Sequence, residues 1–271
     1  MSEQPIGIRN WRDLGGLPTI DGHRVRSGAF FRSAALGDIS DDDVDALARL
    51  GLGAIFDLRT VAEREASPDR VPSGARLETL DVLADKNMGM AANMDADADS
   101  VPAKMATLFE EPEKVESMLG GGKGAELMVQ SYRDMVILPS AVTAFRTVLQ
   151  VMAKDDRPAL VHCTAGKDRT GWAAAVVLSA LGVDEATILA DYMRTNELFL
   201  PALEPTFDRY RAGGGDPDDL RAVLGVRSEY LEAAFDQVRS THGSMQEYLG
   251  AALEAGDAER DTLRERLLVR D

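Results

Sequence analysis

The stretch from Ala159 to Gly182 constrains the fold of this chain more than any other part of it. The apolar run 159–161 follows a proline and predicts a short buried strand. Residues 172–181 are almost all apolar, which is typical of a helix inside a core, and Gly182 supplies the C-terminal stop. The polar residues between strand and helix therefore form a turn that delivers backbone N–H groups to a helix N-terminus. Turns of this kind bind anions.

The side chains in this turn add chemistry to anion binding. Cys163 precedes the predicted helix, where the helix dipole and the cations Lys167 and Arg169 favour a thiolate. The planar guanidinium of Arg169 can hold two oxygens of one phosphate. A thiolate below a bound phosphate, with an arginine across the phosphate oxygens, is equipped for phosphoryl transfer through a phosphocysteine. The alternative interpretation of Cys163 is a buried core thiol.

The residues of the turn also match a known pattern. Cys163, Arg169 and Thr170 fit the Cys-x5-Arg-Ser/Thr signature of the cysteine-based phosphatases, and the whole segment reads HCTAGKDRTG from His162. This form resembles the bacterial branch of the tyrosine phosphatases, which includes a mycobacterial member. Further segments resemble that family in the same order along the chain: 10–16, 31–33, 57–59 with Glu63, and 248–249.

The resemblance and the chemistry together assign roles in the turn. Cys163 is the expected nucleophile, and Thr170 is expected to stabilise the thiolate when it leaves. His162 is expected to order the turn by hydrogen bonds rather than to transfer protons. The expected phosphate-binding residues follow the nucleophile directly: Thr164, Ala165, Gly166, Lys167, Asp168 and Arg169. Lys167 is expected at the rim of the site, where it would contact a second phosphate of a phosphoinositide.

A general acid must protonate the leaving oxygen. The Trp-Pro-Asp loop of many tyrosine phosphatases is absent, because tryptophan occurs only at positions 11 and 172. Asp168, inside the turn, is the first candidate, and Asp81, at the end of a predicted strand, is the second. The alternative role of Asp168 is a charge at the helix N-terminus that pairs with Lys167 or Arg169. Asp69 is interpreted as a turn residue only.

The elements along the chain predict one α/β domain over residues 1–271. Its central sheet is flanked by helices, as in cysteine phosphatases, and a helical elaboration follows at the C-terminus. Residues 84–124 are interpreted as a flexible insertion. Residues 197–245, broken at Gly213–Gly215, are interpreted as a helical lid, and the resemblance favours a lid over a bundle that merely completes the core.

Several local predictions concern other segments. Residues 17–31 are predicted to form a hairpin that turns at Asp21–Gly22. Asn10, Arg12 and Asp13 are expected to form a polar clasp. Arg59 and Glu63 are expected to form a structural ion pair, and Ser140 is expected to cap a helix.

The overall charge excludes some partners. Formal net charge is −16, which argues against nucleic acid and against unassisted binding to anionic membranes, so a phosphate site requires a local positive field.

No apolar run is long enough to span a bilayer, and the N-terminus lacks the apolar core of a secretory signal. A lone cysteine fits the cytoplasm, with export by a route without a cleavable signal left open. No cofactor is expected, and three histidines and one cysteine show no metal-ligand spacing.

These observations predict hydrolysis of phosphate monoesters, with phosphotyrosine or phosphoserine proteins or phosphoinositides as substrates. A phospho-ligand-binding module without turnover would usually lose the nucleophile or the acid. A sulfurtransferase or arsenate reductase also uses a cysteine in an anion-binding turn, but arsenate reduction needs partner thiols that this chain lacks.

Overall fold

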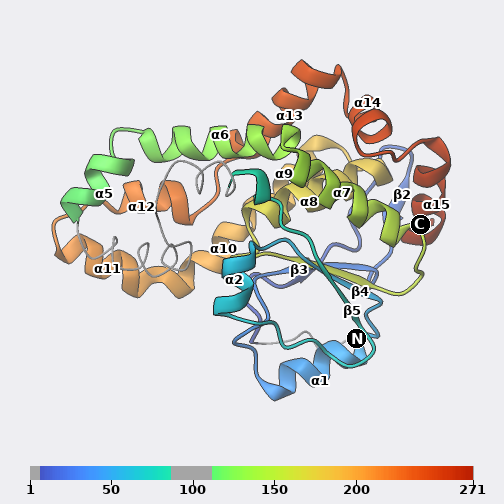
Figure 1. The fold of residues 1–271 in the computed structure, drawn as a ribbon, viewed down its shortest axis with the longest axis horizontal. Coiled ribbons are helices and arrows are strands. Elements are labelled where there is room, and N and C mark those ends of the chain that lie inside the picture. Colours follow the sequence, from blue (N-terminus) through green and yellow to red (C-terminus); the bar gives the residue numbers. More distant parts are fainter. Residues whose placement is uncertain (1–6, 87–111, 271) are drawn as a thin grey trace.

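A computed structural model describes residues 7–86 and 112–270 of the chain. Its centre is a five-stranded sheet in the order β1-β3-β6-β4-β5, with helices on both faces (Figure 1). The strands of this sheet are β1 (Arg12–Asp13), β3 (Phe30–Ser33), β6 (Ala159–His162), β4 (Ala54–Asp57) and β5 (Arg76–Thr79). The predicted α/β class, with a central sheet flanked by helices, is confirmed.

The predicted catalytic strand, β6, lies in the middle of the sheet. It pairs in parallel with β3 on one side and β4 on the other, with Leu160 opposite both Phe31 and Ile55. Successive β6 residues point to opposite faces, so Leu160 enters one apolar cluster and Val161 the other. Strands buried on both faces read as continuous apolar runs, which explains the sequence of β6.

Helices cover the two faces unequally. The cluster that contains Leu160 is completed by residues of α1 (Asp41–Arg49), including Leu47. The larger cluster, which contains Val161, is covered by a layer of longer helices. Helices that contribute buried residues to it include α6 (Lys123–Ile137), α7 (Pro139–Met152), α8 (Asp168–Leu181), α9 (Glu185–Met193), α13 (Ser228–His242) and α15 (Asp257–Leu267).

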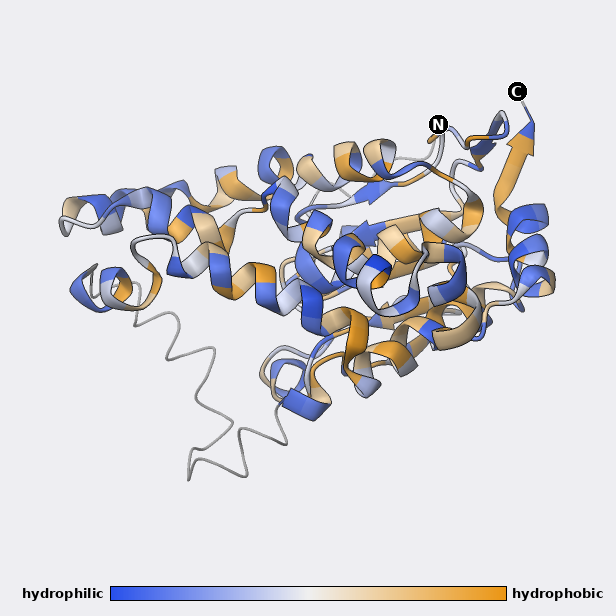
Figure 2. Cartoon of the chain, turned by 90° about the horizontal axis from the view of Figure 1, so that it is seen from above, coloured by the Kyte–Doolittle hydropathy of each residue, from blue (hydrophilic) through white to orange (hydrophobic). Residues whose placement is uncertain are grey.

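Short elements complete the chain around this frame. They are α2 (Val61–Ala66), α5 (Pro112–Leu119), α10 (Thr195–Phe199), η2 (Leu200–Leu203), α11 (Glu204–Ala212), α12 (Pro217–Leu224), α14 (Met245–Glu247) and the π-helical η3 (Tyr248–Ala252). The predicted break at 213–215 separates α11 from α12. These two helices pack with α5 and η2 around a third, smaller apolar cluster centred on Phe207, Tyr210 and Leu220. In Figures 1 and 2 this group projects from one end of the molecule.

The predicted hairpin at 17–31 forms only in part. Its turn exists, since Pro18 bridges Arg24 and Gly22 has a φ of 85°. The following strand, β2 (His23–Val25), pairs instead with β7 (Leu268–Arg270) from the other end of the chain. Phe30 and Phe31 belong to the central sheet, where both of their faces are covered.

The segment between β5 and α7 differs from its predicted form where the structure describes it. Of the predicted insertion at 84–124, residues 87–111 lie outside the described residues, while 112–119 form α5 and α6 begins at Lys123. Ser140 does not cap a helix, because α7 begins one residue earlier at Pro139. Instead, Asp85 accepts a hydrogen bond from the Ser140 backbone N–H at 2.6 Å, and the Ser140 hydroxyl donates to the Val82 carbonyl at 3.0 Å.

Within the described ranges no individual helix combines the length and apolar content needed to cross a bilayer. Helices α6 and α7 meet that requirement only when taken as a pair, and the pair is bent by 64°.

Candidate active site

The candidate site lies where β6 ends and α8 begins. Cys163 directly follows β6 and is buried, and α8 starts at Asp168 and stops at Gly182, whose φ is 87°. The predicted strand, turn and helix are therefore present with nearly the predicted bounds. Because β6 lies between the parallel strands β3 and β4 and the turn follows its last residue, the turn sits at the C-terminal strand edge, where ligands bind in open α/β sheets.

The carbonyl oxygens of the turn accept hydrogen bonds from outside it. The Thr164 carbonyl accepts from the Ala35 N–H at 3.2 Å. The Asn10 side-chain amide donates to the carbonyls of Ala165 at 3.1 Å and Gly166 at 2.8 Å, and Arg32 donates to the Gly166 carbonyl at 2.9 Å. A trans peptide points its N–H opposite to its carbonyl. The outward carbonyls therefore orient the amide hydrogens toward the inside of the turn, where an oxyanion can be bound.

Gly166 is required by this geometry. Its φ is 67°, a left-handed conformation that side chains disfavour. A Cβ at this position would also lie 2.2 Å from the carbonyl oxygen of Ser33, so β3 approaches the turn too closely for any side chain. The glycine lets the turn pack directly against the neighbouring strand.

Arg169 is held in place by Glu63. Its two terminal nitrogens lie 2.6 and 2.7 Å from the two carboxylate oxygens of Glu63, which also contacts the Thr164 hydroxyl. Burial opposes the charged form of both partners, but the pairing overcomes it. The pKa of Glu63 falls to about 2, and the pKa of Arg169 rises through Glu63 and the charge of Cys163. Arg169 is thus fixed beside the thiol by a bidentate pair.

The local sequence places Glu63 for this contact. Thr60 and Glu63 form a capping box at the start of α2, in which the Glu63 carboxylate accepts from the Thr60 N–H at 2.8 Å. The same carboxylate then reaches Arg169. The predicted ion pair between Arg59 and Glu63 is therefore wrong: Arg59 pairs with Asp57 at 2.9 Å and with Asp69 at 2.8 Å.

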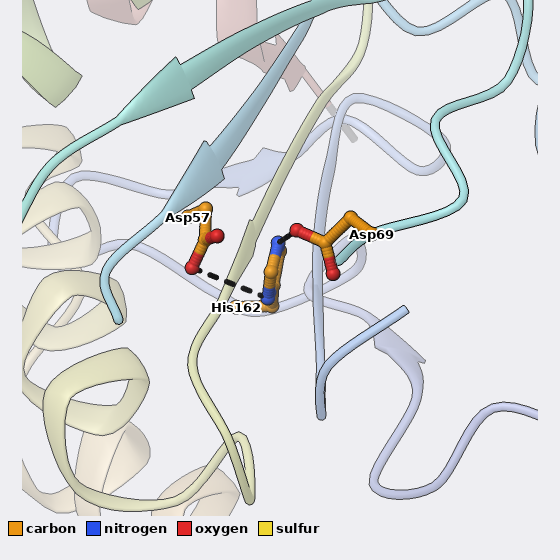
Figure 3. Close-up of side chains that lie close together, drawn as sticks. All are labelled: Asp57, Asp69 and His162. Atoms are coloured by element: carbon orange, nitrogen blue, oxygen red, sulfur yellow. Dashed lines mark ion pairs between the residues drawn. The ribbon is translucent and has the colours of Figure 1, made fainter. Parts of the chain in front are cut away.

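His162 lies between two buried carboxylates behind the turn (Figure 3). Its Nε2 lies 3.1 Å from Asp69 Oδ2, and its Nδ1 lies 4.0 Å from Asp57 Oδ1. Asp69 is more than a turn residue, because its buried side chain pairs with both His162 and Arg59. Burial alone would raise the pKa of Asp69, but these neighbours lower it. This arrangement agrees with a role for His162 in ordering the turn.

The same three side chains are close enough together to hold a metal ion by distance alone. However, one terminal nitrogen of Arg59 already lies within 2.9 Å of an oxygen of each carboxylate. A guanidinium at that position supplies the positive charge that a metal would bring. The residues therefore do not fit a cation site.

Asp168 is contacted from α6, whereas Arg169 is contacted from α2 by Glu63. Its Oδ1 accepts a hydrogen bond from the Tyr132 hydroxyl at 3.0 Å, and its Oδ2 lies 2.7 Å from the Lys167 ammonium. Lys167 also donates to the Gly225 carbonyl at 3.2 Å and is only 6% exposed. Lys167 thus lies inside the site, in contrast to its expected position at the rim. The alternative role predicted for Asp168 is a charge that pairs with Lys167 or Arg169, and of these two residues Lys167 is the one that it contacts.

Two of the predicted catalytic residues remain to be placed, Asp81 and Thr170. Asp81 accepts from the Leu83 N–H at 2.9 Å and from the Val61 N–H at 3.3 Å, so both of its oxygens hold backbone near the start of α2. Thr170 is fully buried in the first turn of α8. Its hydroxyl has no hydrogen-bond partner among the described residues.

A buried cluster of charges lies behind the turn. Asp191 of α9 contacts Arg12 Nε at 2.8 Å and Arg32 at 3.0 Å. Burial, together with the charge of Arg32, lowers the pKa of Arg12 to about 9, so Arg12 still carries its charge at neutral pH. Two buried cations against one carboxylate give the local positive field that a phosphate site needs in a chain of net charge −16. Of the expected clasp, Arg12 donates to Asn10 Oδ1 at 2.6 Å and joins Asp191, which no sequence pattern marks. Asp13 instead accepts from the Gly15 and Gly28 N–H groups at 2.8 and 2.7 Å.

Comparisons with known proteins agree with one another. The model of a family described as the tyrosine phosphatase family matches residues 5–269. The triple specificity protein phosphatase PtpB of Mycobacterium tuberculosis is 33% identical over 264 residues, which cover 90% of this chain and 91% of that protein. A tyrosine-protein phosphatase of Nostoc commune is 32% identical over 239 residues, covering 86% of this chain and 72% of the relative.

Proposed function

The chain belongs to the tyrosine phosphatase family, and from this premise we propose that Cys163 is its nucleophile and Arg169 its main phosphate-binding side chain. The protein is an enzyme that hydrolyses phosphate monoesters. The observation that carries the residue assignment is the turn itself. Cys163 begins the turn, and the carbonyls of the turn face outward. The ion pair with Glu63 holds Arg169 beside the thiol. No metal or cofactor takes part in this scheme.

The reaction proceeds in two displacements. In the first, the Cys163 sulfur forms a bond to phosphorus while the ester P–O bond breaks, and Asp168 gives its proton to the leaving oxygen. The N–H groups of residues 164–169 and the Arg169 guanidinium hold the other phosphate oxygens. In the second, a water oxygen bonds to phosphorus, the S–P bond breaks, and the water proton passes to Asp168. Thr170 donates to the departing thiolate.

We assign the acid to Asp168 in preference to Asp81. Both oxygens of Asp81 accept from backbone N–H groups, one of them at Val61, so its carboxyl is anchored at the start of α2 and not in the turn that carries the nucleophile. Asp168 sits at the first position of α8, on the nucleophile's own turn, where the side chains of Tyr132 and Lys167 contact its carboxyl. Loss of activity in Asp81→Asn with retention in Asp168→Asn would transfer the role to Asp81.

Turnover of para-nitrophenyl phosphate tests the proposal. Activity should persist in EDTA, should be inhibited by vanadate, and should disappear in Cys163→Ser. The serine variant should still bind a phosphotyrosine peptide, because the oxyanion-binding groups remain. Activity retained in Cys163→Ser would refute the assignment of the nucleophile.

For substrates, we propose phosphotyrosine proteins first, with phosphoserine and phosphoinositide esters also accepted. The support for this breadth is the relative named as a triple specificity phosphatase. Lys167 contributes to lipid headgroups only if its ammonium leaves Asp168 and Gly225. Rates on matched phosphopeptides and phosphoinositides, for wild type and Lys167→Met, would measure the breadth and any role of Lys167.

We also propose a cellular location and a role for the C-terminal helices. A reduced thiolate is required at Cys163, which supports a cytoplasmic location; cell fractionation tests it. The helices within 197–245 are proposed to act as a lid, because Asn196 holds the Val226 backbone at 2.8 Å and Gly225 contacts Lys167 of the turn. Hydrogen exchange that slows in this segment when vanadate binds would support the lid.

A further inference from the structure

We propose that Tyr132, itself supported by Tyr192, is a positioning residue that orients the Asp168 carboxyl for proton transfer. This inference rests on the proposed function, in which Asp168 is the general acid. The tyrosines lie on different helices, α6 and α9, and neither is part of the predicted phosphate-binding turn. They come together only in the folded chain.

The two hydroxyls form a directed chain toward Asp168. The Tyr132 oxygen lies 3.0 Å from Asp168 Oδ1 and 2.7 Å from the Tyr192 oxygen. A carboxylate only accepts hydrogen bonds, so the Tyr132 proton points to Asp168. Tyr192 must then be the donor to Tyr132. Each phenol thus has one defined orientation.

Burial makes this chain specific. Tyr132 is 0% exposed and Tyr192 is 1% exposed, within the main apolar cluster. A buried hydroxyl costs free energy unless it is hydrogen-bonded, and phenylalanine at both positions would fill the same space without that cost. The two buried hydroxyls are therefore explained by the group to which they lead, the Asp168 carboxylate.

Several charged or titratable groups face Asp168 from the surrounding elements: Lys167 and Arg169 in the turn and α8, Tyr132 on α6, Tyr192 on α9 and Tyr230 on α13. Burial, followed by the charge of Asp168, raises the pKa of Tyr132 and of Tyr192 far above its usual value. Both phenols therefore stay protonated where the enzyme works and remain donors. Lys167 spans both carboxylate oxygens, at 3.0 Å from Oδ1 and 2.7 Å from Oδ2.

The consequence concerns which oxygen carries the catalytic proton. A bond from Tyr132 occupies Oδ1 and restricts rotation of the carboxyl group. The transferable proton is then placed on Oδ2, while Oδ1 continues to accept from Tyr132 in either protonation state. When Oδ2 carries the proton, the Lys167 ammonium gives up its 2.7 Å contact with that oxygen and keeps its 3.0 Å contact with Oδ1. Without the phenol, the carboxyl can rotate, and the ionised form loses a donor that stabilises it.

The test compares Tyr132→Phe with Tyr230→Phe as a matched control. Tyr230 is equally buried and its ring lies 6.0 Å from that of Tyr132, but its hydroxyl donates to the Ala222 carbonyl at 2.7 Å and does not touch Asp168. Each variant is assayed on phenyl phosphate, whose leaving group needs a proton, and on para-nitrophenyl phosphate, whose leaving group needs it less.

We expect Tyr132→Phe to lower kcat on phenyl phosphate by roughly 3- to 10-fold, with a smaller loss on the nitrophenyl ester and an unchanged KM. Its descending pH–rate limb should move to higher pH. In an Asp168→Asn background the same change should have no further effect on kcat. Tyr192→Phe should act in the same direction but less, because it removes only the donor to Tyr132.

Equal losses on both esters, or an effect no different from Tyr230→Phe, would overturn the inference and leave the acid assignment intact. If Asp168→Asn itself kept wild-type rates on phenyl phosphate, both the acid assignment and this inference would fail. Should Tyr132→Phe fold poorly, the Tyr192→Phe variant decides. If its ratio of rates on the two esters and its pH–rate profile equal those of wild type, the positioning role is refuted.

Discussion

The two sides of the phosphate-binding turn are supported in different ways. On one side, Arg169 is held by a charged partner, Glu63, in a site that leaves the two side chains 13% and 20% exposed. On the other, Asp168 pairs with the Lys167 ammonium at 2.7 Å and also accepts from the neutral phenol of Tyr132, which has no exposed surface. In the proposed scheme, phosphate binding thus depends on the Glu63–Arg169 ion pair, whereas proton transfer depends in addition on hydrogen bonds from buried phenols on α6 and α9. Each side can be broken without the other.

Arg169→Lys should produce the largest effect that separates the two sides. Lysine keeps the charge but cannot span two phosphate oxygens and Glu63 together. We expect kcat/KM to fall by roughly 10³-fold on both phenyl and para-nitrophenyl phosphate, since phosphate oxygens must be held whatever the leaving group. Steady-state kinetics on the two esters measure it. A loss confined to phenyl phosphate would place Arg169 on the proton-transfer side.

Asp168→Asn should show the opposite pattern. Loss of the acid should lower kcat on phenyl phosphate by roughly 10²-fold and on the nitrophenyl ester by much less. The descending limb of the pH–rate profile should disappear. Asp81→Asn is the comparison variant, and the acid assignment predicts that it retains that limb. Retention of the limb in Asp168→Asn would contradict the assignment.

Glu63→Gln should have a smaller effect on rate and a distinct effect on stability. We expect kcat/KM to fall roughly 10-fold, because glutamine has one acceptor oxygen for Arg169 in place of two and carries no negative charge. The folded pKa of Glu63 is about 2, below its usual 4.5, so its ionised form stabilises the native state above pH 4.5. That contribution is lost as pH falls toward 2.

Unfolding by urea across this acid range measures the second effect. The wild-type free energy of unfolding should decline more steeply between pH 4.5 and pH 2 than that of Glu63→Gln, since glutamine does not titrate. Parallel declines would show that the Glu63 pair adds nothing to stability.

The sequence was most informative where a pattern is local. The apolar run 159–161, the apolar helix over 172–181 and the stop at Gly182 follow from spacing and breakers, and the structure contains all three, with the helix beginning at Asp168. The signature from Cys163 to Thr170 was sufficient to predict the family. These features need no knowledge of distant residues.

The errors concern partners that only the tertiary fold brings together. Arg59 and Glu63 are close in sequence, yet Arg59 turns to Asp69 and Glu63 turns to Arg169, more than 100 positions away. A capping-box pattern at Thr60-x-x-Glu63 does predict where Glu63 sits, though not what it contacts. Tyr132 has no such signal, because a tyrosine on the apolar face of a helix reads as core.

Chemical identification of the reaction intermediate tests the central claim most directly. Wild-type enzyme and Cys163→Ser are mixed with excess para-nitrophenyl phosphate, quenched in acid within one turnover, and digested for mass spectrometry. The phosphoryl group should be found on the peptide that contains Cys163 in wild type and on no peptide of the variant. A phosphoryl group on another residue, or turnover by Cys163→Ser, would contradict the assignment of Cys163 as the nucleophile.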